Sequence, residues 1–132
     1  MYKSMNGSLL YVTTSTPYVI QFVGQVARFQ DDPKETHSIA VKRIFRYLKG
    51  TMDFGLWYPK GNEPTLIAYS DVDWAGCVDD RKSTSGTTFF LGGCLVSSSS
   101  KKQSSVSLST AEAEYIAAAA CCTQILWMKQ TL

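Results

Sequence analysis

Two pairs of carboxylates occupy positions where a folded chain could use them for chemistry. Asp71 and Asp73 follow the apolar run 66–69, which is typical of a buried strand. Glu112 and Glu114 open a long alanine-rich segment. Two carboxylates that a fold brings together repel each other unless a cation neutralises them, and their hard oxygens suit Mg²⁺ or Mn²⁺. These acids are therefore candidates for a divalent-metal site.

Asp71 and Glu114 are the pair that we expect to bind a metal. Ser109 and Glu112 have the S-x-x-E spacing of a capping box, which gives Glu112 a structural role. Glu114 has no cationic neighbour on its own helix, so it needs a partner from elsewhere. Asp71 becomes that partner if the helix packs across the strand, whereas we expect Asp73 to point away from the face of Asp71. The alternative is that Asp71 turns the chain and Glu114 is solvated.

The first fifty residues predict two helices. Thr16 can N-cap a helix over residues 17–29, whose apolar residues fall on one stripe. Asp32, with Glu35 three residues later, has the spacing of a capping box at the start of a second helix. Gly50 is a natural end for that helix.

The rest of the chain predicts short strands followed by one long helix. Strands are expected at 54–58, 66–70, 87–91 and 94–98, with a linker at 59–65. Gly92 and Gly93 indicate a hairpin between the last two strands. The serine-rich run 97–105 has the composition of a flexible linker. The long helix begins at Thr110, and we expect Tyr115 to face the core.

The basic residues are unevenly distributed along the chain. A net charge of +2 does not by itself indicate a nucleic-acid partner. Lys42, Arg43 and Arg46, however, lie together on the second predicted helix and avoid its apolar stripe. They form either a solvated face or a surface that meets phosphates.

The cysteines and the hydropathy pattern argue against several other classes of protein. Four cysteines occur without C-x-x-C spacing and His37 is the single histidine, so we expect reduced thiols rather than a zinc site. No apolar run reaches about 18 residues, which argues against a membrane span. The first residues lack the layout of a secretory signal, so we expect an intracellular protein, in a cytoplasmic particle or in the nucleus.

Several longer motifs follow one another in order along the chain. They are GSLLYVTTSTP (7–17), HSIAVKRIFRYLKGT (37–51), FGLWY (54–58), YSDVDWAG (69–76), RKSTSG (81–86), SKKQ (100–103) and STAEAEY (109–115). The last four resemble the ribonuclease H region of copia-type LTR retrotransposon polyproteins. The first three are similar to the C-terminal end of the reverse transcriptase that precedes it. The resemblance covers nearly the whole chain.

This resemblance implies an α+β fold in two parts. Residues 1–58 would form the helical hairpin and short strand that end a reverse transcriptase, followed by the linker at 59–65. Residues 66–132 would form an incomplete ribonuclease H-like fold of three antiparallel strands and a long helix. That family hydrolyses the RNA strand of RNA–DNA hybrids with two divalent ions, Mg²⁺ or Mn²⁺, held by four acids. Asp71 and Glu114 match the first two acids. The choice of Glu114 agrees with the capping box, which assigns Glu112 to the helix cap.

The resemblance also implies a nucleic-acid surface. Its candidate contacts are Arg81, Ser83, Thr84, Lys102 and Gln103, together with the basic helix residues Lys42, Arg43 and Arg46. Such short polar and basic groups suit RNA–DNA hybrids, which are recognised by shape, phosphate and 2′-hydroxyl. The expected partners are an RNA–DNA hybrid or other nucleic acid, and the remainder of the polyprotein.

The match departs from the family pattern at its ends. The third and fourth acids of the family lie after the long helix, beyond Leu132, and the polymerase aspartates lie before Met1. We therefore expect a truncated copy without polymerase activity and without hydrolysis on its own. The alternatives are a nucleic-acid-binding remnant that does not cleave, and a structural relic without function.

Overall fold

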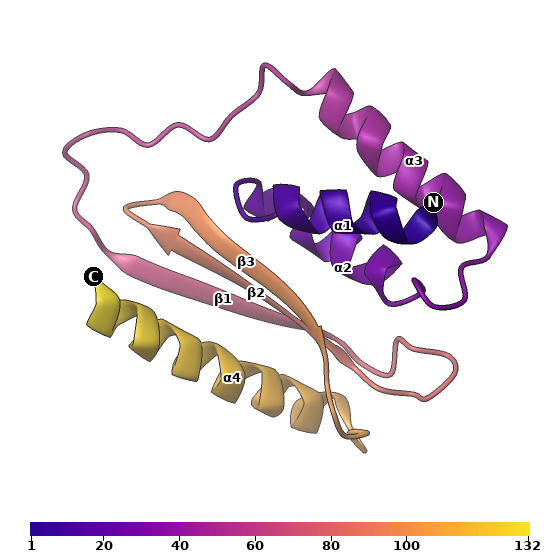
Figure 1. Ribbon diagram of the computed structural model, residues 1–132. Helices are drawn as coiled ribbons and strands as arrows, with labels where there is room; N and C mark the ends of the chain where they lie inside the picture. Colours follow the sequence, from indigo (N-terminus) through magenta and orange to yellow (C-terminus); the bar gives the residue numbers. More distant parts are fainter. The chain divides into compact units, whose positions relative to one another are not determined.

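The computed structural model describes all 132 residues and divides them into two compact units. The first unit is Met1–Trp57 and the second is Tyr58–Leu132 (Figure 1). The first contains only helices, and the second combines an antiparallel sheet with one helix. None of the helices is both long and apolar enough to cross a membrane.

The first unit packs three α-helices and one 3₁₀ turn around a small aliphatic core. Its elements are α1 (Tyr2–Val12), η1 (Pro17–Val19), α2 (Ile20–Ala27) and α3 (Glu35–Gly50). Leu9, Val23 and Val41 come from the three α-helices and are fully buried. Val19 of η1 joins the same cluster. Each of the four elements thus contributes at least one buried residue to this core.

Helix α1 was not predicted from the sequence. Its buried positions are Tyr2, Asn6 and Leu9, and two of these three are polar, so the apolar period is weak. The structure supplies partners for them: the Tyr2 hydroxyl donates to the carbonyl of Val26 at 2.6 Å, and Asn6 Nδ2 donates to the same carbonyl at 3.3 Å. Tertiary hydrogen bonds to the end of α2 therefore anchor this helix.

The starts of the other two helical segments differ in detail from the predictions. Thr16 is the N-cap residue as predicted, but of the 3₁₀ turn η1, and its side chain makes no capping bond. Asp32 is not the N-cap of α3. Lys34 occupies that position, and its amide donates to Nδ1 of His37 at 3.1 Å. His37 stacks on Phe29, so the imidazole is held where it can accept this bond.

The second unit contains a three-stranded antiparallel sheet and a long helix, as expected. Its elements are β1 (Leu66–Asp73), β2 (Thr84–Leu91), β3 (Cys94–Lys102) and α4 (Thr110–Thr131). The strand order is β1-β2-β3. Gly92 and Gly93 form the predicted hairpin turn with φ of +58° and +80°, which residues with a Cβ rarely adopt. The predicted strand at 54–58 is absent, because no strand of the sheet pairs with it.

The serine-rich run 97–105 is not a linker. Residues 97–102 belong to β3, and Thr87 and Ser99 lie opposite each other with their hydroxyls hydrogen-bonded. Composition alone indicated flexibility, but pairing with β2 satisfies the backbone of these residues. The register shift beside Phe89 lies between the Phe89↔Ser97 and Phe90↔Leu95 pairs.

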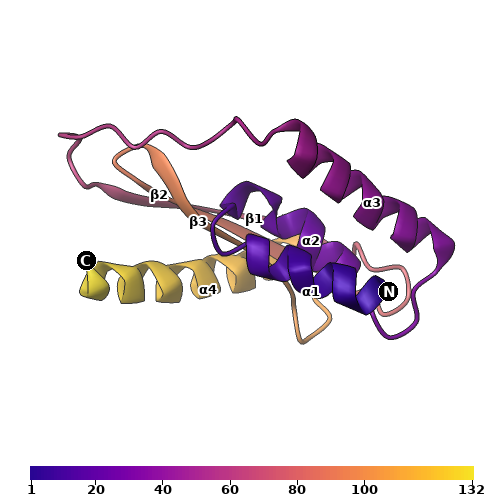
Figure 2. The same ribbon diagram turned by 45° about the horizontal axis from the view of Figure 1, so that its top comes forward.

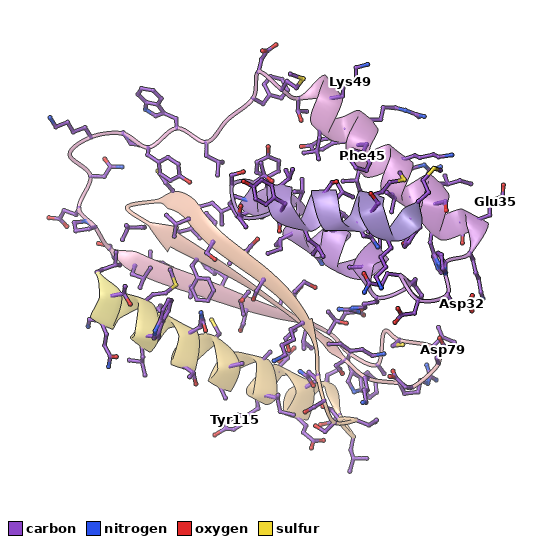
Figure 3. All side chains as sticks on the ribbon, in the orientation of Figure 1. Asp32, Glu35, Phe45, Lys49, Asp79 and Tyr115 are labelled. Carbon is purple, nitrogen blue, oxygen red and sulfur yellow. The ribbon has the colours of Figure 1, made fainter.

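Helix α4 covers one face of the sheet and runs back toward the start of β1 (Figure 1, Figure 2). Its buried positions Ala113, Ala117 and Cys121 are four residues apart, and these small side chains allow a close approach to the strands. Phe89 of β2 is 2% exposed and is the largest fully buried side chain. Tyr115 was expected to face the core, but it is 79% exposed and points away from the sheet (Figure 3).

A buried amide ties the sheet to α4. Gln103 follows β3 and is 7% exposed. Its Nε2 donates to Ser85 Oγ and to the carbonyl of Ala113, both at 2.9 Å. Its Oε1 accepts from Ser107 Oγ at 3.2 Å, and its backbone amide donates to the carbonyl of Ser83 at 2.8 Å. One side chain therefore joins β2, the turn before α4 and the first turn of that helix.

We predict that Gln103→Met destabilises the protein. Methionine has a similar length but leaves the carbonyl of Ala113 and the hydroxyls of Ser85 and Ser107 without this partner. The expected loss is about 2 kcal/mol in the free energy of unfolding, measured by urea denaturation. Gln124→Met, at an exposed position on α4, is the control and is expected to change that free energy by less than about 0.5 kcal/mol. Equal effects of the two substitutions would contradict this role of Gln103.

Candidate metal and nucleic-acid site

Asp71 lies near the end of β1, where it is exposed. Its Oδ1 accepts a hydrogen bond from the amide of Val72 at 2.8 Å. Gln103 bridges Ser85 and α4, and Ser85 pairs with Val72, so Val72 belongs to the sheet face that α4 covers. Asp71 alternates onto the other face. Asp73 shares this face with Asp71, because β1 continues through it, so the expectation that they point apart was wrong.

The two glutamates at the start of α4 differ in their contacts, and the expected capping role of Glu112 is confirmed in part. Ser109 Oγ accepts from the amide of Glu112 at 3.2 Å, which confirms the N-cap. Glu112 Oε2 reaches back, but to the amide of Leu108 at 2.6 Å rather than to that of Ser109. Glu114 is exposed and follows Ala113, so it lies beside the buried stripe of the helix. Glu112 is thus committed to the cap and Glu114 is not.

The acids fit a divalent cation in chemistry but not in number. Asp71 and Glu114 offer exposed carboxylate oxygens, and Mg²⁺ commonly binds through one or two carboxylates while it keeps several waters. No group of three or more histidine, cysteine, aspartate or glutamate side chains is placed to hold a metal. These two residues therefore do not amount to a ligand set for two metal ions. α4 packs on the sheet face opposite Asp71, so the structure does not bring Asp71 and Glu114 together as the sequence led us to expect. Their joint binding of a metal stays a prediction.

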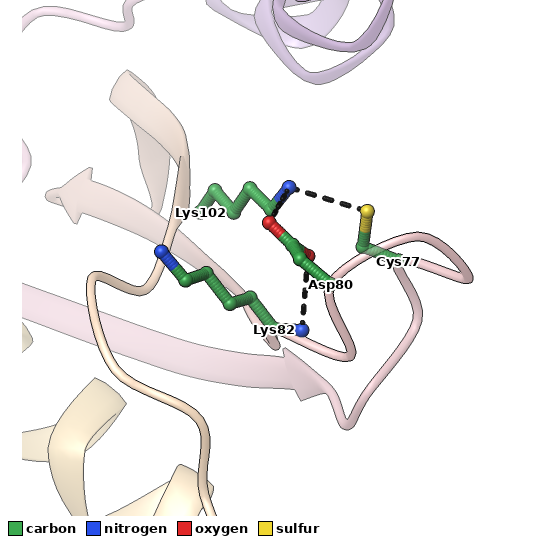
Figure 4. A network of polar contacts seen from close by, with 4 residues as sticks. All are labelled: Cys77, Asp80, Lys82 and Lys102. Carbon is green, nitrogen blue, oxygen red and sulfur yellow. Dashed lines mark hydrogen bonds and ion pairs between the residues drawn. The ribbon is translucent and has the colours of Figure 1, made fainter.

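An ion pair that the sequence did not predict joins the loop between β1 and β2 to the end of β3 (Figure 4). Lys102 Nζ lies 2.6 Å from Asp80 Oδ2 and 3.2 Å from Cys77 Sγ. The amide of Lys82 donates to Asp80 Oδ1 at 3.2 Å. The Lys102 ammonium, with the Cys77 thiol beside it, holds the pKa of the Asp80 carboxyl well below its usual range. Asp80 in turn raises the pKa of Lys102.

This network changes what Lys102 can do. The pair forms because the β2–β3 register sets Thr84 opposite Lys102, which brings the end of β3 beside the loop. Asp80 already neutralises the Lys102 ammonium, so this lysine is not a free cation at the surface. The sequence signal was only the dipeptide Asp79-Asp80 before two basic residues, and a partner in β3 cannot be read from it.

Other predicted contact residues are divided between the surface and the interior. Ser83 is fully buried, and its hydroxyl accepts from the amide of Ala75 at 3.1 Å, which closes the loop. Gln103 is likewise buried. Thr84 is half-buried at the start of β2, whereas Arg81 is exposed and has a φ of +55°. Arg81 is thus the member of this group that the structure leaves at the surface, and the role of each in binding stays a prediction.

The predicted basic surface lies on α3 in the first unit. Lys42, Arg43 and Arg46 are all exposed. After Glu35 at its start, α3 contains no carboxylate, and Lys49 lies near its other end (Figure 3). The helix therefore presents cations without acids to neutralise them.

Comparison with known proteins identifies the class to which this mixed α/β chain belongs. It is 44% identical to the retrovirus-related Pol polyprotein from transposon TNT 1-94 of Nicotiana tabacum, over 99% of this chain and 10% of that protein. It is 42% identical to the retrovirus-related Pol polyprotein from transposon RE1 of Arabidopsis thaliana, over 96% of this chain and 9% of that protein. Secreted RxLR effector protein 161 of Plasmopara viticola is 41% identical, over 96% of this chain and 90% of that protein.

The chain belongs to the family of retrovirus-related Pol polyproteins of copia-type transposons. It spans about a tenth of the length of the polyproteins that it matches. No protein-family model matches the chain. No solved structure matches it either.

We predict a pH-dependent effect of Asp80→Asn. The folded-state pKa of Asp80 lies below its unfolded value of about 3.9, so the ion pair stabilises the protein above that pH. This stabilisation is lost as the pH falls through the folded-state pKa. The substitution is expected to lower the thermal unfolding midpoint at neutral pH by a few degrees at most, because the pair is half-exposed.

The measurement compares thermal unfolding of both proteins at neutral pH and below about pH 3.9, where the difference is expected to narrow. Asp79→Asn, the exposed neighbour, is the matched control and is expected to leave the midpoint at neutral pH unchanged. A difference that widens in acid would contradict the assignment of the ion pair.

Proposed function

We propose that this chain is part of the ribonuclease H region of a copia-type Pol polyprotein and contributes Asp71 and Glu114 to hydrolysis of the RNA strand of RNA–DNA hybrids. One observation carries the proposal. Three antiparallel strands in sequence order precede a helix that packs on the sheet, with Asp71 near the end of β1 and Glu114 in an early turn of α4. The motifs that link these elements are those that the sequence shares with this region.

Asp71 on the open face of the sheet and Glu114 on α4 would each offer an exposed carboxylate oxygen to a divalent metal. A bound divalent ion supplies activation of water and stabilisation of the leaving oxygen. Asp71 keeps Oδ2 available, because only Oδ1 accepts from the backbone. Glu112 is excluded as a ligand by its capping bond to Leu108. The proposed role of this chain is thus to present two candidate ligands, one on the open face of the sheet and one on α4.

We propose that further ligands come from other parts of a Pol polyprotein. No third histidine, cysteine, aspartate or glutamate gathers with two others in the structure. Because this chain spans about a tenth of the polyproteins that it matches, the rest of such a polyprotein is the natural source. We propose that the isolated chain binds a hybrid but does not cleave it.

A second candidate function is nucleic-acid binding without cleavage. The observation that favours it is the group of exposed cations on α3, Lys42, Arg43 and Arg46. No carboxylate follows Glu35 on this helix, so none neutralises them. Phosphate contacts made by such residues release counterions, so binding weakens as salt increases. This function requires no metal and is compatible with the first.

The metal proposal is tested by Mn²⁺ titration of the chain followed by amide NMR. Paramagnetic broadening is expected around the end of β1 and the first turns of α4. Asp71→Asn and Glu114→Gln are each expected to weaken Mn²⁺ binding severalfold, because each removes one of two charged ligands. Asp79→Asn, an exposed carboxylate outside the site, is the control and is expected to leave binding unchanged. Broadening that persists in both site variants would contradict the assignment.

The binding proposal is tested by the salt dependence of hybrid affinity. Combined substitution of Lys42, Arg43 and Arg46 by glutamine is expected to weaken binding and to reduce the slope of log affinity against log salt by roughly 2–3. The control replaces three exposed lysines elsewhere, and these are Lys3, Lys60 and Lys129. The proposal is contradicted if the control variant shows the same decrease in affinity and in salt slope as the α3 variant. Binding would then depend on the net charge of the chain and not on α3.

A further inference from the structure

The first unit contains an open pocket between its helical segments. The pocket has a volume of about 380 Å³. One wall comes from η1 and α2 and the other from α3, and its lining residues are Tyr18, Val19, Phe22, Arg43, Ile44 and Tyr47. All of them belong to one compact unit, so the pocket does not depend on where the second unit lies.

The residues that line this pocket differ in burial, with one aliphatic side chain in the core and two aromatic rings exposed. Val19 is 2% exposed and packs in the core with Val23 and Val41. Phe22 and Tyr47, in contrast, are 58% and 53% exposed. More than half of each of these two rings is therefore open to solvent, whereas Val19 of the same pocket is buried in the core.

The pocket opens beside the cations of α3. Arg43 lines the pocket and also belongs to the basic surface with Lys42 and Arg46. On a helix, Arg43 neighbours Arg46 and Tyr47 at spacings of three and four, so these side chains share one side. An open pocket lined by aromatic and aliphatic side chains, next to two guanidinium groups, complements a ligand that combines flat rings with negative charge.

We propose that this pocket binds an unpaired nucleobase of a single-stranded nucleic acid. The base stacks on Phe22 and Tyr47, and the flanking phosphates contact Arg43 and Arg46. The ligand is single-stranded because the faces of a paired base are already covered by its neighbours in the duplex. The inference rests on the second candidate function, nucleic-acid binding by the cations of α3, and adds to it a site for a single strand with its stacking residues.

The test measures binding of the full chain to a fluorescein-labelled oligothymidine by fluorescence anisotropy. An abasic oligonucleotide with the same number of phosphates serves as the second probe. Phe22→Ala and Tyr47→Ala remove the stacking rings, whereas Tyr47→Phe retains one. Tyr11→Ala is the control, because Tyr11 is an 80% exposed aromatic of the same unit outside the pocket. Circular dichroism establishes that each variant keeps its helices.

Each pocket substitution by alanine is expected to weaken oligothymidine binding by roughly fivefold to a hundredfold, as expected for loss of a base–aromatic stack. Tyr47→Phe and Tyr11→Ala are expected to bind as the unmodified chain does. Affinity for the abasic probe is expected to stay the same in all variants. This pattern separates stacking from attraction to phosphate.

Three results would overturn the inference. The first is an equal loss for both probes, and the second is binding of neither probe by the unmodified chain. The third is unchanged oligothymidine binding with altered sedimentation of the free chain, which would assign the pocket to a protein contact. The Mn²⁺ titration is independent of all three, so failure of the pocket and failure of the ribonuclease H proposal are distinguishable.

Discussion

The buried side-chain amide of Gln103 is the interaction on which the strand–helix unit depends. Both of its polar atoms are used, and they connect β2, the turn before α4 and the first turn of that helix. An amide this buried is costly unless it is satisfied, so the hydrogen bonds select one position of α4 over the sheet. The ion pair of Lys102, the preceding residue, attaches the β1–β2 loop to the same point. Asp71 and Glu114 take their positions from elements that this contact joins.

The scaffold uses some of the polar motif residues for its own structure and leaves others exposed. Glu112 and Ser83 lie within motifs that suggested a functional role. Their hydrogen bonds instead stabilise the helix cap and the β1–β2 loop. Asp71 and Glu114 remain exposed and available. The proposed function assigns these two carboxylates to a metal, and no group of three or more histidine, cysteine, aspartate or glutamate side chains gathers in the structure.

Local signals predicted the elements that local chemistry determines. Gly92 and Gly93 indicated the hairpin, and Ser109 indicated the start of α4. The sequence did not predict α1 or the extension of β3 through its serines, because Asn6 and Ser99 acquire partners only from Val26 and Thr87 in the folded chain. The Asp80–Lys102 pair was missed for the same reason, since the two residues are adjacent only in the β2–β3 register. Likewise, the alanine stripe of α4, rather than Tyr115, faces the sheet.

The central claim is that this chain binds an RNA–DNA hybrid and supplies two carboxylates to a metal site that needs further ligands. The most direct test incubates the purified chain with a labelled RNA–DNA hybrid and Mg²⁺ or Mn²⁺, and follows retention and cleavage of the hybrid in the same samples. The account predicts that the hybrid is bound and remains intact. Cleavage that disappears in both Asp71→Asn and Glu114→Gln would contradict it, because the chain would then contain a complete catalytic site.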